Sequence, residues 1–203
     1  MVQIPPPQPF REFITDLSYG LSHYYRSERI LMINWMYFPK NKTPDIVSNK
    51  IVEAFSSVAP NIDSYTYRYS SNDVLAIARP YLEKIGFDVE KNKKSQGKVT
   101  VPVLYGLNGR IEKSFDADGY YKESGYVVEV EAGRGVINYQ FLKDFFEACT
   151  MADVNYLCIA VRNIYESGNL RSNDFERVCR FFEALYASNR LEVPLSGILI
   201  IGY

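Results

Sequence analysis

The sequence predicts a mixed α/β fold in which helices cover both faces of a sheet. Three observations lead to this prediction. From Ser71 onward, the apolar periodicity gives the order helix, three antiparallel strands, helix, strand, helix, strand. Asn108-Gly109 is typical of a tight hairpin turn, and the continuous apolar run from Asn155 to Arg162 is typical of a central strand.

Residues 1–70 are expected to form a mainly helical extension to a core of residues 71–203, with one compact domain as the alternative. Apolar residues recur at helical spacing over Phe10–Arg29, whereas Ile30–Phe38 fits either a strand or a buried helix. Two further elements complete this region. They are a helix from the cap Thr43 to about Phe55, and a short strand in which Tyr65, Tyr67 and Tyr69 alternate.

The core begins with a helix that Ser71 caps, that is kinked or restarted at Pro80 and that ends at Gly86. A short strand from Phe87 then passes into a basic loop that reaches Lys94. The hydrophobic pattern sets the remaining elements. The expected strands are Val99–Leu107, Arg110–Tyr121, Tyr126–Ala132, Asn155–Arg162 and Leu195–Ile201, and the expected helices are Asn138–Thr150 and Asn173–Asn189.

The composition excludes several classes of protein. The 203-residue chain has 23 basic and 24 acidic residues, so a polyanion partner would need a local basic face. No apolar run approaches the ~20 residues that cross a bilayer, and the first residues lack a signal-peptide pattern. Three scattered cysteines fit a reduced, cytoplasmic protein, and the single histidine, His23, excludes chemistry that needs two histidines.

Two acidic pairs interrupt the predicted strands. Glu129 and Glu131 lie two positions apart within the apolar run that follows Gly125, and Asp116 and Asp118 have the same spacing on the strand before it. Side chains alternate across a strand, so each pair points to one side of the sheet. Like charges crowded on neighbouring strands are unfavourable unless a cation or a proton compensates them.

The turn between these two strands decides which acids meet. With Glu123 and Ser124 at its centre, Asp118 faces Glu129 and Asp116 faces Glu131. With the centre one residue later, Asp118 faces Glu131 instead. Asp118 therefore pairs with a glutamate in both registers and is the stronger candidate than Asp116.

Three carboxylates on one hairpin predict a Mg²⁺ site, with Mn²⁺ as a substitute, because Mg²⁺ prefers oxygen ligands. The alternative is a solvated outer face, but the apolar neighbours of the glutamates argue against it. A second alternative is that Gly133-Arg134-Gly135 forms a dinucleotide loop. That fingerprint needs a third glycine where Asn138 stands, so the glycines are better explained as the link from strand to helix.

These residues resemble the signature of the PD-(D/E)xK nuclease superfamily, whose core is helix, three antiparallel strands, helix, strand. Asp118 matches its first acid, and Glu129-Val130-Glu131 matches (D/E)-x-K with Glu131 in place of the lysine, as in an E-x-E minority of restriction endonucleases. The resemblance covers residues 71–203. It implies a restriction endonuclease-like fold, with Glu83 as an additional acid from the first core helix and Gln140 as a residue of the helix after the third strand.

The resemblance further implies a Mg²⁺-dependent DNA endonuclease, of restriction type, that hydrolyses phosphodiester bonds. Asp118, Glu129 and the Val130 carbonyl would hold the metal, with Asp116 as a further ligand, and Glu131 would be a second ligand or a general base. The residues expected to meet the DNA are Lys91, Lys93, Lys94, Lys98, Arg134 and Gln140. The alternative is an inactive member of the fold that binds nucleic acid or oligomerises. The sequence leaves the oligomeric state open, a homodimer included.

Overall fold

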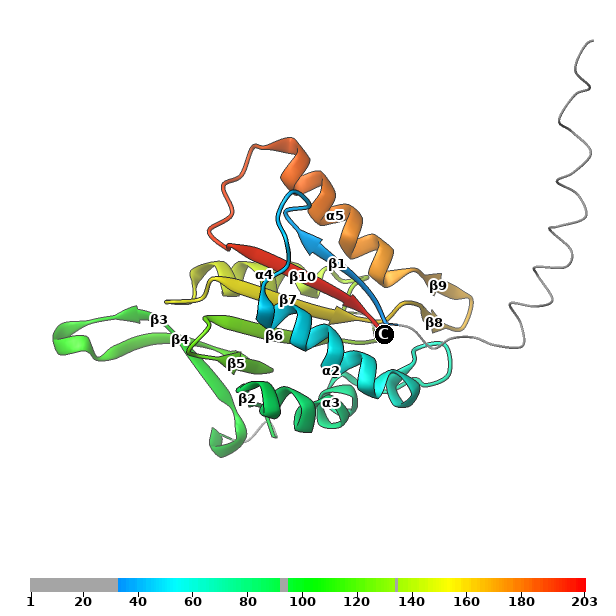
Figure 1. Ribbon diagram of the computed structural model, residues 1–203, viewed down its shortest axis with the longest axis horizontal. Coiled ribbons are helices and arrows are strands. Elements are labelled where there is room, and N and C mark those ends of the chain that lie inside the picture. Colours follow the sequence, from blue (N-terminus) through cyan, green and yellow to red (C-terminus); the bar gives the residue numbers. More distant parts are fainter. Residues whose placement is uncertain (1–32, 92–94, 134) are drawn as a thin grey trace, which may run out of the picture. The chain divides into compact units, whose positions relative to one another are not determined.

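A six-stranded mixed sheet organises the part of the chain that the structure, a computed structural model, describes: residues 33–91, 95–133 and 135–203 (Figure 1). In spatial order its strands are β1 (Asn34–Phe38), β10 (Gly197–Gly202), β7 (Tyr156–Val161), β6 (Tyr126–Glu131), β5 (Gly119–Tyr121) and β2 (Asp88–Val89). β6, β7 and β10 are parallel, and the remaining pairs are antiparallel. The mixed α/β class is therefore confirmed.

Two layers of helices give the sheet two apolar cores (Figure 1). α2 (Ile46–Ile62) and α3 (Ser71–Ile85) pack on one face. α4 (Gln140–Thr150) and α5 (Asp174–Ser188) pack on the other. The central strand β7 is apolar along its length because both of its faces are covered, as the sequence predicted.

Some predictions fall outside the described residues or on a different boundary. The helix expected over Phe10–Arg29, His23, and the site residues Lys93, Lys94 and Arg134 lie outside the described residues. The described residues belong to one compact unit, in which β1 pairs with β10 and α2 contributes to a core. In the described part of residues 1–70, the segment left open between strand and helix forms the strand β1, and α2 is helical, as expected.

Capping chemistry places the helix starts one or two residues away from their predicted positions. Asp45, and not Thr43, caps α2, because its carboxylate accepts bonds of 2.8 and 2.9 Å from the N–H groups of Val47 and Ser48. Ser70, and not Ser71, caps α3 through a capping box with Asp73. Both helices also continue through a proline.

The continuation of α2 is explained by its apolar stripe. It extends past the predicted end at Phe55 to Ile62 because Val58, Ala59 and Ile62 are buried on the same face. Burial of these side chains offsets the backbone hydrogen bond that Pro60 cannot make. α3 ends at Gly86, as predicted, where φ is +121°.

The strand expected over Arg110–Tyr121 is divided at Asp118. Its first part, β4 (Ile111–Ala117), pairs only with β3 (Val99–Tyr105) in a separate two-stranded ribbon that extends beyond the main sheet (Figure 1). The turn of this ribbon has positive φ at Asn108 and Gly109, which confirms the predicted hairpin. The second part, β5, belongs to the main sheet and pairs with β6.

One local assignment from the sequence was wrong, and one small element was missed. Tyr65, Tyr67 and Tyr69 form no strand; instead the Tyr67 and Tyr69 rings stack on each other after a turn. A small hairpin of β8 (Tyr165–Ser167) and β9 (Leu170–Ser172) was not predicted, because each strand is only three residues long.

Single 3₁₀ turns occupy Ser95–Gly97 and Leu107–Gly109. None of the helices in the described ranges has the length and apolar character needed to cross a membrane.

Candidate active site

A cavity of about 370 Å³ lies where the carboxyl end of β6 meets α4 and the amino end of α3. The alternation of β6 explains its chemistry. Val128 and Val130 point into the core beneath α2 and α3, whereas Val127 points into the core beneath α4 and α5. Glu129 and Glu131 continue the side of Val127, so the same face changes from apolar to acidic along one strand. The cavity, called the acid cavity below, is lined by seven acids and two lysines.

Hydrogen bonds to the backbone hold the carboxylates of Asp118 and Glu129 near each other. The carboxylate of Asp118 accepts a 2.8 Å hydrogen bond from the Val130 N–H. The Glu129 carboxylate accepts one from the backbone of Asp118. The β5–β6 register, in which Gly119 faces Val128 and Tyr121 faces Tyr126, is the first of the two predicted registers. The predicted proximity of Asp118 and Glu129 is therefore present.

Glu131 finds its partner on α4 instead of on β4. Its side chain hydrogen-bonds the carboxyl group of Asp144, and burial together with this contact raises the pKa of Glu131 to about 9. Burial also raises the pKa of Asp144. The two side chains thus share a proton at neutral pH. Gly135 leaves room for this arrangement, because a Cβ there would lie 1.9 Å from Oε2 of Glu131.

The acid cavity is electrostatically unfavourable as it stands. Burial, with the nearby charges of Asp118 and Asp144, raises the pKa of Glu129 well above its ordinary value. Asp144 is 7% exposed, and its Oδ2 atom has no hydrogen-bond partner among the described residues. A buried carboxylate oxygen without a partner is costly. A cation at this position would satisfy both the charge and the free lone pairs.

Lys143 supplies positive charge from the same helix. Its ammonium group lies 3.7 Å from Oδ1 of Asp144 and 3.0 Å from Oε2 of Glu147. Burial opposes ionisation of this lysine, but the hydrogen bond to Glu147 and the surrounding carboxylates outweigh it and raise the pKa of Lys143. Lys143 is therefore a fixed cation within a cluster of acids.

The structure places the other predicted residues less centrally. Asp116 lines the acid cavity, but β4 does not pair with β6, so Asp116 faces Thr100 and forms an ion pair with Lys98 instead of meeting Glu131. Gln140, Val130 and Lys98 also line the cavity.

Glu83 and Lys91 lie apart from the acid cavity and line a second, larger cavity instead. α3 brings Ser71 to the acid cavity, and twelve residues of helix place Glu83 about 18 Å further along the axis. The expectation that Glu83 adds an acid to the site is therefore wrong for this helix.

Sequence reasoning missed Lys143, Asp144 and Glu147. The signal was present, because Gln140, Lys143, Asp144 and Glu147 follow the spacing that places residues on one face of a helix. These polar side chains line the acid cavity. The adjacent face of α4 presents Phe141, Phe145 and Ala148 to the core, which fixes the rotation of the helix.

The donor set suits a hard cation by its chemistry, since every acidic donor is a carboxylate oxygen. Among the described residues, however, no three acidic, cysteine or histidine side chains are already arranged to hold a metal ion. Binding would require the Glu131–Asp144 pair to lose its proton and open.

Comparisons with known proteins add no identification. No protein-family model, curated protein or solved structure matches this chain.

Proposed function

We propose that the protein is a Mg²⁺-dependent nuclease that hydrolyses phosphodiester bonds in DNA, built on a restriction endonuclease-like core. The observation that carries this proposal is the gathering of Asp118, Glu129, Glu131 and Asp144 in one cavity beside Lys143. Burial and nearby charges raise the pKa values of Glu129, Glu131 and Asp144. These carboxyl groups are therefore stabilised when a divalent cation replaces their protons.

The order and direction of the elements support the same assignment. α3 is followed by three antiparallel strands of the main sheet, β2, β5 and β6, with the β3–β4 ribbon inserted between β2 and β5, and then by α4 and by β7, which is parallel to β6. This agrees with the helix, three strands, helix, strand order of the PD-(D/E)xK superfamily. Asp118 directly precedes β5, the second of those strands, and Glu129 lies on β6, the third.

Four acids of the cavity have roles in the proposed reaction. Asp118, Glu129 and Asp144 would hold Mg²⁺, or Mn²⁺ in its place. A divalent ion held there would neutralise charge on the phosphate and lower the pKa of a water molecule for in-line attack. Glu131, once it has lost the proton that it shares with Asp144, accepts the proton of that water.

Lys143 replaces the lysine of the (D/E)-x-K motif, whose position is occupied by Glu131 in this chain. Its ammonium group comes from α4 instead of β6, and it faces the same carboxylates. A cation there orients the water or the phosphate oxygen by hydrogen bonding.

One observation favours the alternative of an inactive fold that binds nucleic acid or oligomerises. The Glu131–Asp144 hydrogen bond already neutralises part of the cluster without a metal. In that case, Mg²⁺ would have no effect on the protein, and the acid cavity would be a relic of catalysis.

Plasmid nicking separates the two functions. The wild-type protein should convert supercoiled DNA to the open form with Mg²⁺ or Mn²⁺ and should not do so with EDTA. Glu129→Gln should abolish nicking, whereas Glu53→Gln, an exposed position on α2, should retain it. Nicking that survives Glu129→Gln would reject the proposal, and DNA binding without any nicking would favour the inactive fold.

A further inference from the structure

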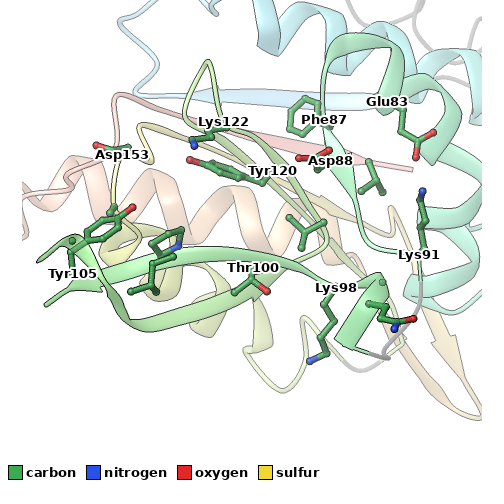
Figure 2. A pocket seen from close by; sticks show the side chains of 18 residues that line it. Glu83, Phe87, Asp88, Lys91, Lys98, Thr100, Tyr105, Tyr120, Lys122 and Asp153 are labelled. Carbon is green, nitrogen blue, oxygen red and sulfur yellow. The ribbon is translucent and has the colours of Figure 1, made fainter. Parts of the chain in front are cut away.

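A second cavity adjoins the acid cavity and is more than twice as large, at about 890 Å³. It lies between the end of α3 with β2, the strand β5, and one side of the β3–β4 ribbon (Figure 2). A volume of this size is within the range of pockets that enclose a small organic ligand, ~300–1,000 Å³. Nothing in the proposed cleavage chemistry uses it.

One end of this cavity combines aromatic surface with hydrogen-bonding groups. Tyr105, Tyr120, Lys122 and Asp153 gather there (Figure 2). Tyr105 is 52% exposed, so about half of its surface is open to a ligand, whereas Tyr120 is 8% exposed. Burial, then the charge of Asp153 and the nearby Tyr105, raises the pKa of Tyr120, which is consistent with the three groups lying close together. This end can stack a flat ring and exchange hydrogen bonds with its edge.

The other end leads toward the acid cavity. Lys91 and Lys98 lie at this end (Figure 2), and Lys98 lines both cavities. Glu90, the neighbour of Lys91, lines the acid cavity. Lys98 is therefore the point at which a chain molecule with its reacting group at the carboxylates would pass from the acid cavity to the larger one.

The charges of the larger cavity argue against a purely electrostatic site. Its lysines, Lys91, Lys98 and Lys122, are balanced by Glu83, Asp88 and Asp153. Phosphates alone would be repelled by these acids, but a base edge is not, because carboxylates accept hydrogen bonds from exocyclic amino groups. The combination of ring face, acceptors and lysines matches a whole nucleotide.

We propose that the larger cavity binds an unpaired nucleotide of the same strand whose phosphate is cleaved in the acid cavity. Its base stacks on Tyr105 and hydrogen-bonds near Asp153, while Lys91 and Lys98 contact the phosphates between the two cavities. A base that is paired in a duplex cannot present its face and its pairing edge together, so the site selects single-stranded or frayed DNA. This inference rests on the proposed function and names its substrate class.

Binding measured without cleavage tests the inference separately from the chemistry. Fluorescence anisotropy in EDTA compares a labelled single-stranded oligonucleotide with the blunt duplex of the same sequence. Wild-type protein should prefer the single strand, and Tyr105→Ala should weaken binding of that strand by roughly 5- to 150-fold, the range for one lost stacking contact. Duplex binding should change little.

A matched control and a second variant complete the test. Tyr65→Ala removes a comparably exposed tyrosine, 48%, from a different part of the surface and should leave both affinities unchanged. Lys91→Gln should weaken the single strand and reduce the salt dependence by about one phosphate contact. If Tyr105→Ala binds the single strand as tightly as wild type, the inference is wrong.

The two proposals fail in distinguishable ways. Absence of nicking with intact, Tyr105-dependent binding would reject the catalytic proposal alone. Nicking that requires Glu129 together with equal affinity for both DNA forms would reject the larger cavity as a nucleotide site alone. In that second case, the lysines contact the backbone of an intact duplex.

Discussion

The Asp118 carboxylate accepts a hydrogen bond from the Val130 N–H, and the backbone of Asp118 donates one to the carboxylate of Glu129 on β6. This reciprocal contact lies where the antiparallel strand divides into β4 and β5. The carboxylates of Asp118 and Glu129 therefore lie close together on one side of the sheet. The repulsion that results is the physical basis of the first prediction.

Asp118→Asn should separate stability from function. The amide oxygen can still accept from Val130, but the charge that raises the pKa of Glu129 is lost. We expect the unfolding midpoint without metal to rise by a few degrees, and Mg²⁺-dependent nicking to fall on the order of a hundredfold or more. Differential scanning fluorimetry with and without Mg²⁺ should also show that the metal-induced rise of the wild type disappears.

Glu192→Gln, at an exposed position near the end of the chain, is the control for this charge change. It should leave the midpoint, the Mg²⁺ response and the nicking rate as in the wild type. A Mg²⁺ response that persists in Asp118→Asn would show that the ion binds elsewhere.

Glu131 should make the protein less stable as the pH rises. Its pKa is about 9 in the folded state against an ordinary value of 4.5. Below pH 4.5 both states are protonated; between 4.5 and about 9 only the folded state keeps the proton. The free energy of unfolding therefore falls through this window and levels off above it.

Thermal unfolding over this pH range, in EDTA, measures the effect. Glu131→Gln should flatten the decline, with a gain of several degrees at the alkaline end, at roughly 2–4 °C per kcal/mol for a domain of this size. Glu129 and Asp144 also have raised pKa values, so part of the slope should remain. An unchanged slope in Glu131→Gln would contradict the shared proton.

Lys143 should matter for the reaction more than for the fold. Lys143→Gln removes the ammonium group that faces Asp144 and Glu147, and we expect nicking to fall by roughly a hundredfold. The lost i,i+4 pair with Glu147 costs only about 0.5 kcal/mol of stability. Lys143→Arg should restore part of the rate.

Lys50→Gln on the exposed side of α2 is the matched control for the lysine change. The kinetic comparison is made with saturating Mg²⁺, so that weakened metal binding does not lower the rate. Equal rates for Lys143→Gln and the wild type would exclude this lysine from the reaction.

Gly125 sets the turn that brings Asp118 to Glu129. It has φ of +64°, and a Cβ there would lie 2.4 Å from the backbone oxygen of Asp153. Gly133 has a similar φ of +60°, with nothing within 4 Å of its Cβ position among the described atoms. Gly133→Ala should cost about 1–2 kcal/mol, and Gly125→Ala roughly 1–3 kcal/mol more, as measured by chemical denaturation. Equal costs would mean that the turn tolerates the methyl group.

The sequence was sufficient to predict that Asp118 lies beside one of the two glutamates, but not which one. Strand alternation and a short turn leave only two registers, and Asp118 meets a glutamate in each of them. The position of Asp116 could not be predicted, because it depends on the break at Asp118. Once the strand divides, Asp116 follows the ribbon and takes Lys98 as its partner.

The contribution of α4 was predictable in part. The polar spacing of Gln140, Lys143, Asp144 and Glu147 is visible in the sequence, but it is equally typical of a solvated helix face. Only the packing of Phe141 and Phe145 shows that this face turns toward β6. Sequence spacing therefore gives the face of the helix, and tertiary packing gives its direction.

The change of β6 from Val127 to Glu129 and Glu131 along one face has a consequence for evolution of the protein. Methionine or leucine in place of Glu129 and Glu131 would extend the apolar core beneath α4 and fill the acid cavity. Such a protein would have a larger free energy of unfolding. Retention of the two glutamates instead keeps a destabilising cluster of buried carboxyl groups beside the central strand β7. A laboratory selection for heat resistance alone should therefore erase these glutamates early, and with them whatever chemistry they serve.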